Sequence, residues 1–131
     1  FSNSNLNIIE YSYDEDPGHS AKNYTSKVFS KVDKFNAAIL GVGEDGHIAS
    51  LFPDTTALNA DEKSFVQNEV NILTKWRVTS TFELLKNVEN VYLLVTGDNK
   101  KEIIKKIGKE NDLPVNKLIH LRKKTVLLTD Q

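Results

Sequence analysis

The chain has 131 residues, enough for one domain with its own core, and its 39% hydrophobic and 27% charged content is ordinary for a globular protein. The net charge of −1 gives no general attraction to nucleic acid or to an anionic membrane, and no apolar stretch is long enough to span a bilayer. The absence of Cys excludes disulfides and thiolate chemistry and fits a reducing compartment, so we expect a cytoplasmic protein.

In chain order, the hydrophobic pattern alternates between strand-like and helix-like segments. Short apolar runs predict strands, and apolar residues spaced three or four apart predict helices. The predicted strands cover residues 5–11, 35–40, 65–70, 77–80, 90–96 and 125–128. The predicted helices cover residues 20–32, 47–52, 81–88 and 100–107, with an exposed loop at 54–64 and a turn or short helix at 113–114.

This order predicts an α/β fold with a mostly parallel, Rossmann-like sheet and helices on both of its faces. The continuous apolar run at 35–40 is typical of a parallel strand that is covered on both sides. There are no internal repeats and no linker, so residues 1–131 are expected to form a single domain. Because the chain begins at Phe1 and contains no Met, we expect it to be a fragment of a longer chain.

The loop at residues 41–47 (GVGEDGH) follows a predicted buried strand, which is where ligands bind in open α/β sheets. It contains G-x-G-x-x-G, the pattern of dinucleotide-binding loops. Three features count against a dinucleotide. Glu44 and Asp45 place negative charge where a pyrophosphate lies, Pro53 ends the following helix early, and no strand precedes Asp61 at the expected place.

The segment at residues 40–53 (LGVGEDGHIASLFP) resembles the signature of the 6-phosphogluconolactonase family. Glucosamine-6-phosphate isomerases share the G-x-G-x-D-G-H core but continue toward F-N-E-P, where this chain has Ser50-Leu51-Phe52-Pro53. Further blocks agree with the family in the same order. They are Arg77-Val78-Thr79 (R-[IV]-T), Gly97 to Lys100 (G-x-x-K), Leu113-Pro114 and a last strand that ends in Asp130.

The resemblance implies a NagB/lactonase-type fold that lacks its N-terminal part. The family's N-terminal half carries a Gly-rich phosphate loop and a D-E-R segment, and neither is present in this chain. Part of the substrate site is therefore expected to lie outside residues 1–131.

The reaction implied by the resemblance is opening of 6-phosphoglucono-δ-lactone by water. His47 is the candidate base that activates the water, since imidazole titrates near neutral pH. Two roles stay open for Asp45, which either orients the His47 ring or caps the helix predicted to follow. The backbone N–H groups from Gly43 to Gly46 are candidates for stabilising the oxyanion.

Arg77 and Lys100 are the candidate ligands of the substrate phosphate. Only two of the 17 basic residues are Arg, so an Arg that persists is more often needed for its planar, bidentate fork. Lys100 follows Gly97 at the end of a predicted core strand, although its lysine neighbours are also typical of a solvated helix face.

Two other functions remain as alternatives: a glucosamine-6-phosphate isomerase or deaminase, and a non-catalytic protein that binds sugar phosphates. Three scattered His and no Cys predict no metal site, and we expect no cofactor. The expected partner is a sugar-phosphate lactone. Because some protozoan relatives are fused to glucose-6-phosphate dehydrogenase, the resemblance also raises a fusion to, or association with, that enzyme.

Overall fold

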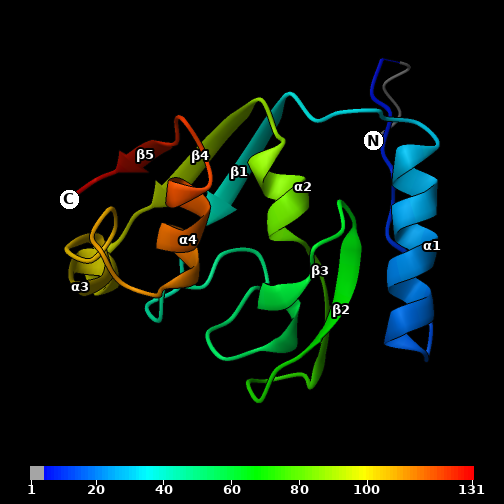
Figure 1. The fold of residues 1–131 in the computed structure, drawn as a ribbon, viewed down its shortest axis with the longest axis horizontal. Coiled ribbons are helices and arrows are strands. Elements are labelled where there is room, and N and C mark those ends of the chain that lie inside the picture. The colour runs from blue at the N-terminus through cyan, green and yellow to red at the C-terminus, as the bar shows by residue number, and fades with distance from the viewer. Residues whose placement is uncertain (1–4) are drawn as a thin grey trace.

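The computed structural model describes residues 5–131 and contains a parallel sheet and a separate antiparallel hairpin (Figure 1). The parallel sheet has the strand order β1-β4-β5, and Leu93 of the central strand lies opposite Leu127. Its strands are β1 (Ala37–Gly41), β4 (Asn90–Val95) and β5 (Val126–Thr129). The predicted α/β class with a parallel sheet is confirmed.

The hairpin consists of β2 (Phe65–Glu69) and β3 (Trp76–Ser80), and helix α1 (Pro17–Phe29) packs against it (Figure 1). Asp16 caps α1, since its Oδ1 accepts hydrogen bonds from the N–H groups of Gly18 and His19 at 2.8 and 3.0 Å. The helix begins at residue 17 and not at the predicted residue 20, because Pro17 occupies its first position. It ends at residue 29, three residues before the predicted end.

Short helices connect the strands of the parallel sheet. Thr81 caps α2, because its hydroxyl accepts a hydrogen bond from the N–H of Leu84 at 3.1 Å. The α-helices are α2 (Phe82–Lys86), α3 (Lys101–Ile104) and α4 (Pro114–His120), and two 3₁₀ helices are η1 (Thr56–Asn59) and η2 (Asp98–Lys100). Residues 54–64 were expected to be an exposed loop, but η1 buries Ala57 there.

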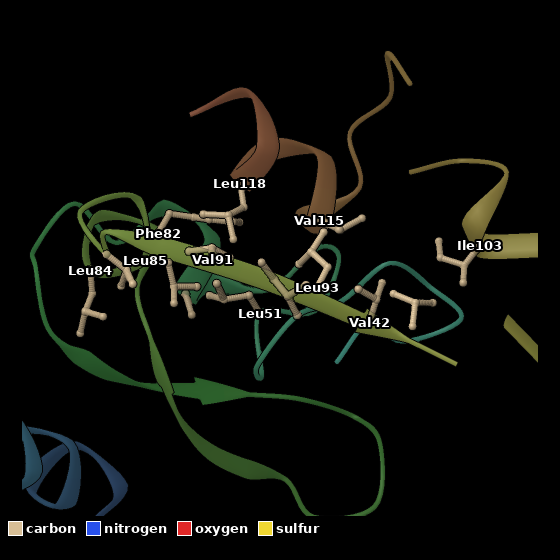
Figure 2. Packing of buried hydrophobic residues seen from close by; sticks show 14 residues of the cluster. Val42, Leu51, Phe82, Leu84, Leu85, Val91, Leu93, Ile103, Val115 and Leu118 are labelled. Carbon is tan, nitrogen blue, oxygen red and sulfur yellow. The ribbon is translucent and has the colours of Figure 1, made fainter. Parts of the chain in front are cut away.

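The main core lies on one face of the parallel sheet. Figure 2 shows Val115 and Leu118 of α4 close to Val91 and Leu93 of β4, and all four are buried. On the other face, Ile39 is 72% exposed and Leu94 is 46% exposed. Within the described residues the helices of this core cover one face of the sheet, and the cover expected on the second face of residues 35–40 is not seen there.

Residues 5–11 do not form the predicted strand. They run beside α1 instead (Figure 1), where the Tyr24 hydroxyl donates to the carbonyl of Ile9 and Lys27 Nζ donates to that of Glu10 at 2.8 Å. Side-chain contacts with the helix take the place of a strand ladder. Tyr11 lies edge-on to Tyr24 of α1, whereas Leu6 and Ile8 are more than half exposed.

Arg122 fixes the connection after α2. Its Nη1 donates to the carbonyl oxygens of Leu85, Lys86 and Val88 at 2.7–2.9 Å. Burial among these carbonyls lowers the pKa of the guanidinium from its ordinary value. This Arg therefore uses its fork on the backbone carbonyls at the end of a helix.

Candidate active site

His47 lies in a tight turn after β1. The carbonyl of His47 accepts a hydrogen bond from the Gly43 N–H at 2.9 Å, and Ile48 forms single bridges with Val42 and Leu51. Ile48 and Leu51 are both fully buried, so they anchor this turn in the core. The helix predicted at 47–52 is wrong, because these bridges and a left-handed Ala49 (φ 50°) replace it. A dinucleotide loop needs a helix at this point, and none begins here.

The His47 ring is held at its edge and on its face. Its Nδ1 lies 2.6 Å from Asp45 Oδ1, and the same oxygen accepts a hydrogen bond from the His47 N–H at 3.1 Å. The Phe52 ring stacks on the imidazole with centroids 4.1 Å apart. Nε2 has no hydrogen-bond partner among residues 5–131. The geometry therefore matches an orienting role for Asp45, and there is no helix for it to cap.

The Asp45 carboxylate is stabilised by His47. Burial raises the pKa of Asp45, but the hydrogen bonds from the His47 ring and backbone N–H together outweigh that effect. The pKa of this carboxyl therefore lies below its ordinary value. An ionised Asp45 beside Nδ1 favours the tautomer that carries its proton on Nδ1 and leaves Nε2 as a hydrogen-bond acceptor.

Replacing Asp45 with Asn is expected to lower stability at neutral pH but not in acid. A lowered folded-state pKa means that the carboxylate stabilises the fold above its unfolded-state pKa, and that this contribution is lost as the pH falls through the folded-state pKa. Since the Asp45 side chain is 41% exposed, screening keeps the effect below about 1 kcal/mol. Unfolding midpoints of both proteins, measured from neutral to acid pH, test this; a difference independent of pH would contradict it.

Five of the six predicted site residues line one cavity of about 560 Å³. They are Gly43, Asp45, His47, Arg77 and Lys100. Gly46 is not in the lining; it adopts φ +81° and lies so close to Leu113 that an added Cβ would be 3.0 Å from the Leu113 Cβ. Gly46 thus allows the left-handed backbone of the turn and its close contact with Leu113, and it does not line the cavity.

Both candidate phosphate ligands are bonded to the protein in this structure. Lys100 Nζ donates to the Val42 carbonyl at 2.9 Å, which ties η2 to the end of β1. Arg77 donates to the carbonyl of Ile72 at 3.1 Å and to the Thr74 hydroxyl. The N–H groups of Gly43 and Gly46 are also used, because they donate to His47 and Gly43 carbonyls. Their roles toward substrate stay predictions.

Sequence reasoning missed two features of the site. Phe52 stacks on His47, whereas the sequence indicated only that Pro53 ends a helix after it. Asn99 donates to Glu44 Oε1 at 2.7 Å and so connects η2 with the loop before His47. Within residues 5–131, no group of three or more acidic or His side chains is arranged to hold a metal ion, and no helix is long and apolar enough to cross a membrane.

Comparison with known proteins gives the family. A family model described as glucosamine-6-phosphate isomerases/6-phosphogluconolactonase matches residues 2–128. The chain belongs to this family. It is 37% identical over 92 residues to the 6-phosphogluconolactonase of Helicobacter pylori, a match that covers 67% of this chain and 40% of that protein. It is 42% identical over 73 residues to that of Chlamydia trachomatis, covering 56% of this chain and 28% of that protein.

Solved structures agree with this assignment. The structure of 6-phosphogluconolactonase from Thermotoga maritima matches with a TM-score of 0.68 and 30% identity, over 85% of this chain and 50% of that one. The chain thus spans 28–40% of the length of the two relatives named above and half of the solved structure.

Proposed function

We propose that the full-length protein is a 6-phosphogluconolactonase, which hydrolyses 6-phospho-D-glucono-1,5-lactone to 6-phosphogluconate in the oxidative pentose phosphate pathway. The observation that carries this proposal is the shared cavity, where a His–Asp pair lies beside two cationic side chains. Such a cavity combines a base for water with ligands for a phosphate. The relatives named above, which are 6-phosphogluconolactonases, support the same reaction.

In the proposed reaction, His47 Nε2 takes a proton from water as the water oxygen attacks the lactone carbonyl carbon. Asp45 holds the Nδ1 proton and stabilises the imidazolium that forms. The tetrahedral oxyanion then collapses, the bond between the carbonyl carbon and the ring oxygen breaks, and His47 returns its proton to that oxygen. The product is an open-chain acid with a hydroxyl where the ring oxygen was, and no cofactor is required.

Arg77 and Lys100 bind the 6-phosphate in this proposal. Both line the same cavity as His47, and their present acceptors are neutral oxygens of the protein. A phosphate dianion is a stronger acceptor than a carbonyl or hydroxyl, so it displaces the Ile72 and Thr74 contacts of Arg77. Gly43 contributes room, because any side chain there would meet the His47 ring.

We further propose that residues 1–131 belong to a single lactonase-type domain whose substrate site is completed by other parts of the full-length chain. The bare sheet face around Ile39 and Leu94 supports this, as does the length of the relatives. A cytoplasmic location and a fusion to, or association with, glucose-6-phosphate dehydrogenase also stay predictions. Co-purification from the source cell tests the association.

The substrate class is tested by comparing lactones with and without the phosphate. Two charge-assisted contacts of roughly 1.5 kcal/mol each correspond to about 100-fold. The full-length protein is therefore expected to show a kcat/KM about 100-fold higher for the phosphorylated lactone than for glucono-δ-lactone. Turnover of glucosamine 6-phosphate in place of the lactone would favour the isomerase alternative. Binding of 6-phosphogluconate without turnover of any substrate would favour a sensor.

A further inference from the structure

Ser50, three residues after His47, is held on both sides by buried side chains of the β2–β3 hairpin. Its N–H donates to Thr79 Oγ1 at 3.0 Å, and its carbonyl accepts from Asn68 Nδ2 at 2.8 Å. Thr79 is 3% exposed and Asn68 is fully buried. Buried polar side chains are costly unless their hydrogen bonds are made, so these two bonds strongly favour one position of Ser50.

The residues that hold Ser50 lie on the same face of the hairpin as Arg77. Arg77 and Thr79 are two residues apart on β3 and therefore point to the same side. Asn68 of β2 lies directly opposite Arg77 in the antiparallel register, which places its side chain on that side as well. One face of one hairpin thus carries both Arg77, one of the two cations of the cavity, and the contacts to Ser50.

The segment from His47 to Ser50 has little freedom to move. At one end, the His47 carbonyl accepts a hydrogen bond from the Gly43 N–H. Ile48, which lies between His47 and Ser50, is fully buried. At the other end, Asn68 also donates to the Thr55 hydroxyl at 3.0 Å and accepts from the Ala57 N–H at 3.2 Å. The two bonds to Ser50 therefore fix the end of the turn that is not fixed by Gly43.

We propose that Thr79 and Asn68 are positioning residues, which set the place of the His47 imidazole relative to the Arg77 guanidinium. The inference rests on the proposed function, because that distance becomes the distance between the base and the bound phosphate. A shift of about 1 Å between such groups lowers rates by about 100-fold. Neither residue lines the His47 cavity, so both act through the backbone of Ser50.

The test uses Thr79→Val in the full-length protein, which keeps the shape and removes the acceptor. Thr79→Ser restores the hydroxyl. Thr125→Val is the matched control, because the Thr125 hydroxyl is buried without a hydrogen-bond partner in the described part of the chain. Thr79→Val is expected to lower kcat by about 10- to 100-fold with KM changed less than about 3-fold. Thr79→Ser should recover most of the rate, and Thr125→Val should retain it.

A double-mutant cycle separates positioning from general destabilisation. If Thr79 acts through His47, Thr79→Val lowers the rate of the wild type but not the residual rate of His47→Gln. A loss of the same size in both backgrounds would overturn the proposal. Asn68→Ala is expected to follow the same pattern.

The third readout does not depend on activity. The imidazole NMR signals of His47, assigned by their loss in His47→Gln, should shift in Thr79→Val but not in Thr125→Val, while the signals of His19 stay unchanged. Unshifted His47 signals together with an unchanged rate would overturn the inference. A wild type without lactonase activity would overturn the proposed function instead, and the ring signals would still decide whether Thr79 positions His47.

Discussion

Replacing His47 with Gln in the full-length protein is expected to lower kcat for hydrolysis of 6-phosphoglucono-δ-lactone by about 10²- to 10⁴-fold, the usual contribution of a positioned general base. Gln retains polar atoms but cannot accept a proton from water near neutral pH. KM should change little, because Arg77 and Lys100 still bind the phosphate. The measurement is steady-state acid release, with the spontaneous rate subtracted.

The chain contains a matched control for this substitution. His19 Nδ1 lies 2.5 Å from Asp14 Oδ2, which is nearly the same pair geometry as His47 with Asp45. His19 is 59% exposed and lies at the start of α1, away from the cavity. His19→Gln is therefore expected to retain the wild-type rate. Equal losses in both variants, or no loss in His47→Gln, would remove His47 from the mechanism.

Replacing Gly43 with Ala is expected to lower kcat by about 100-fold, although no catalytic group is removed. An added Cβ would lie 2.0 Å from His47 Nδ1 and 2.6 Å from Asp45 Oδ1, so the imidazole and its partner must move. A misplacement of a catalytic group by about 1 Å lowers the rate by about 100-fold. The variant should keep its fold, because both side chains are partly exposed and can rotate toward solvent.

Gly41→Ala is the control for this prediction, because an added Cβ at that position meets nothing within 4 Å. It introduces the same methyl group two residues earlier and is expected to retain most of the activity. Circular dichroism of both variants establishes that they are folded. A fully active Gly43→Ala variant would contradict the described position of the His47 ring.

Most of the strands followed from local sequence patterns, but the strand predicted at residues 5–11 and the helix predicted at the turn that carries His47 did not form. The apolar runs at β1 and β4 and the paired strands β2 and β3 were predicted to within about two residues. Residues 47–52 were predicted to be helical because their pattern, followed by Pro53, is typical of a short helix. Two hydrogen bonds of Ser50 with side chains far along the chain favour the observed conformation instead: its N–H donates to Thr79 and its carbonyl accepts from Asn68. Such contacts leave no mark in the local pattern.

The scarcity of Arg had limited predictive value. Both Arg side chains use their guanidinium fork, as the sequence suggested, but for different purposes. Arg77 lines the cavity beside His47, whereas Arg122 binds the carbonyl groups that follow α2. The residue type indicates the geometry of the contact. Only the fold determines whether a ligand or the backbone accepts the hydrogen bonds of the guanidinium.

The composition of β1 predicted burial on both faces, yet Ile39 is exposed. The apolar character of a strand reflects all of its neighbours in the complete protein, including any part of the domain outside the described residues 5–131. The proposed activity is assigned to the full-length protein, because the matches cover only 28–40% of the two curated relatives named above.

We propose above that this cavity, in the full-length protein, hydrolyses a phosphorylated sugar lactone. The most direct test is the initial rate of acid release when the full-length protein is mixed with freshly prepared 6-phosphoglucono-δ-lactone, compared with the spontaneous rate in the same buffer. We expect a rate that rises in proportion to protein concentration and far exceeds the spontaneous rate. A rate equal to the spontaneous one at every protein concentration would contradict it.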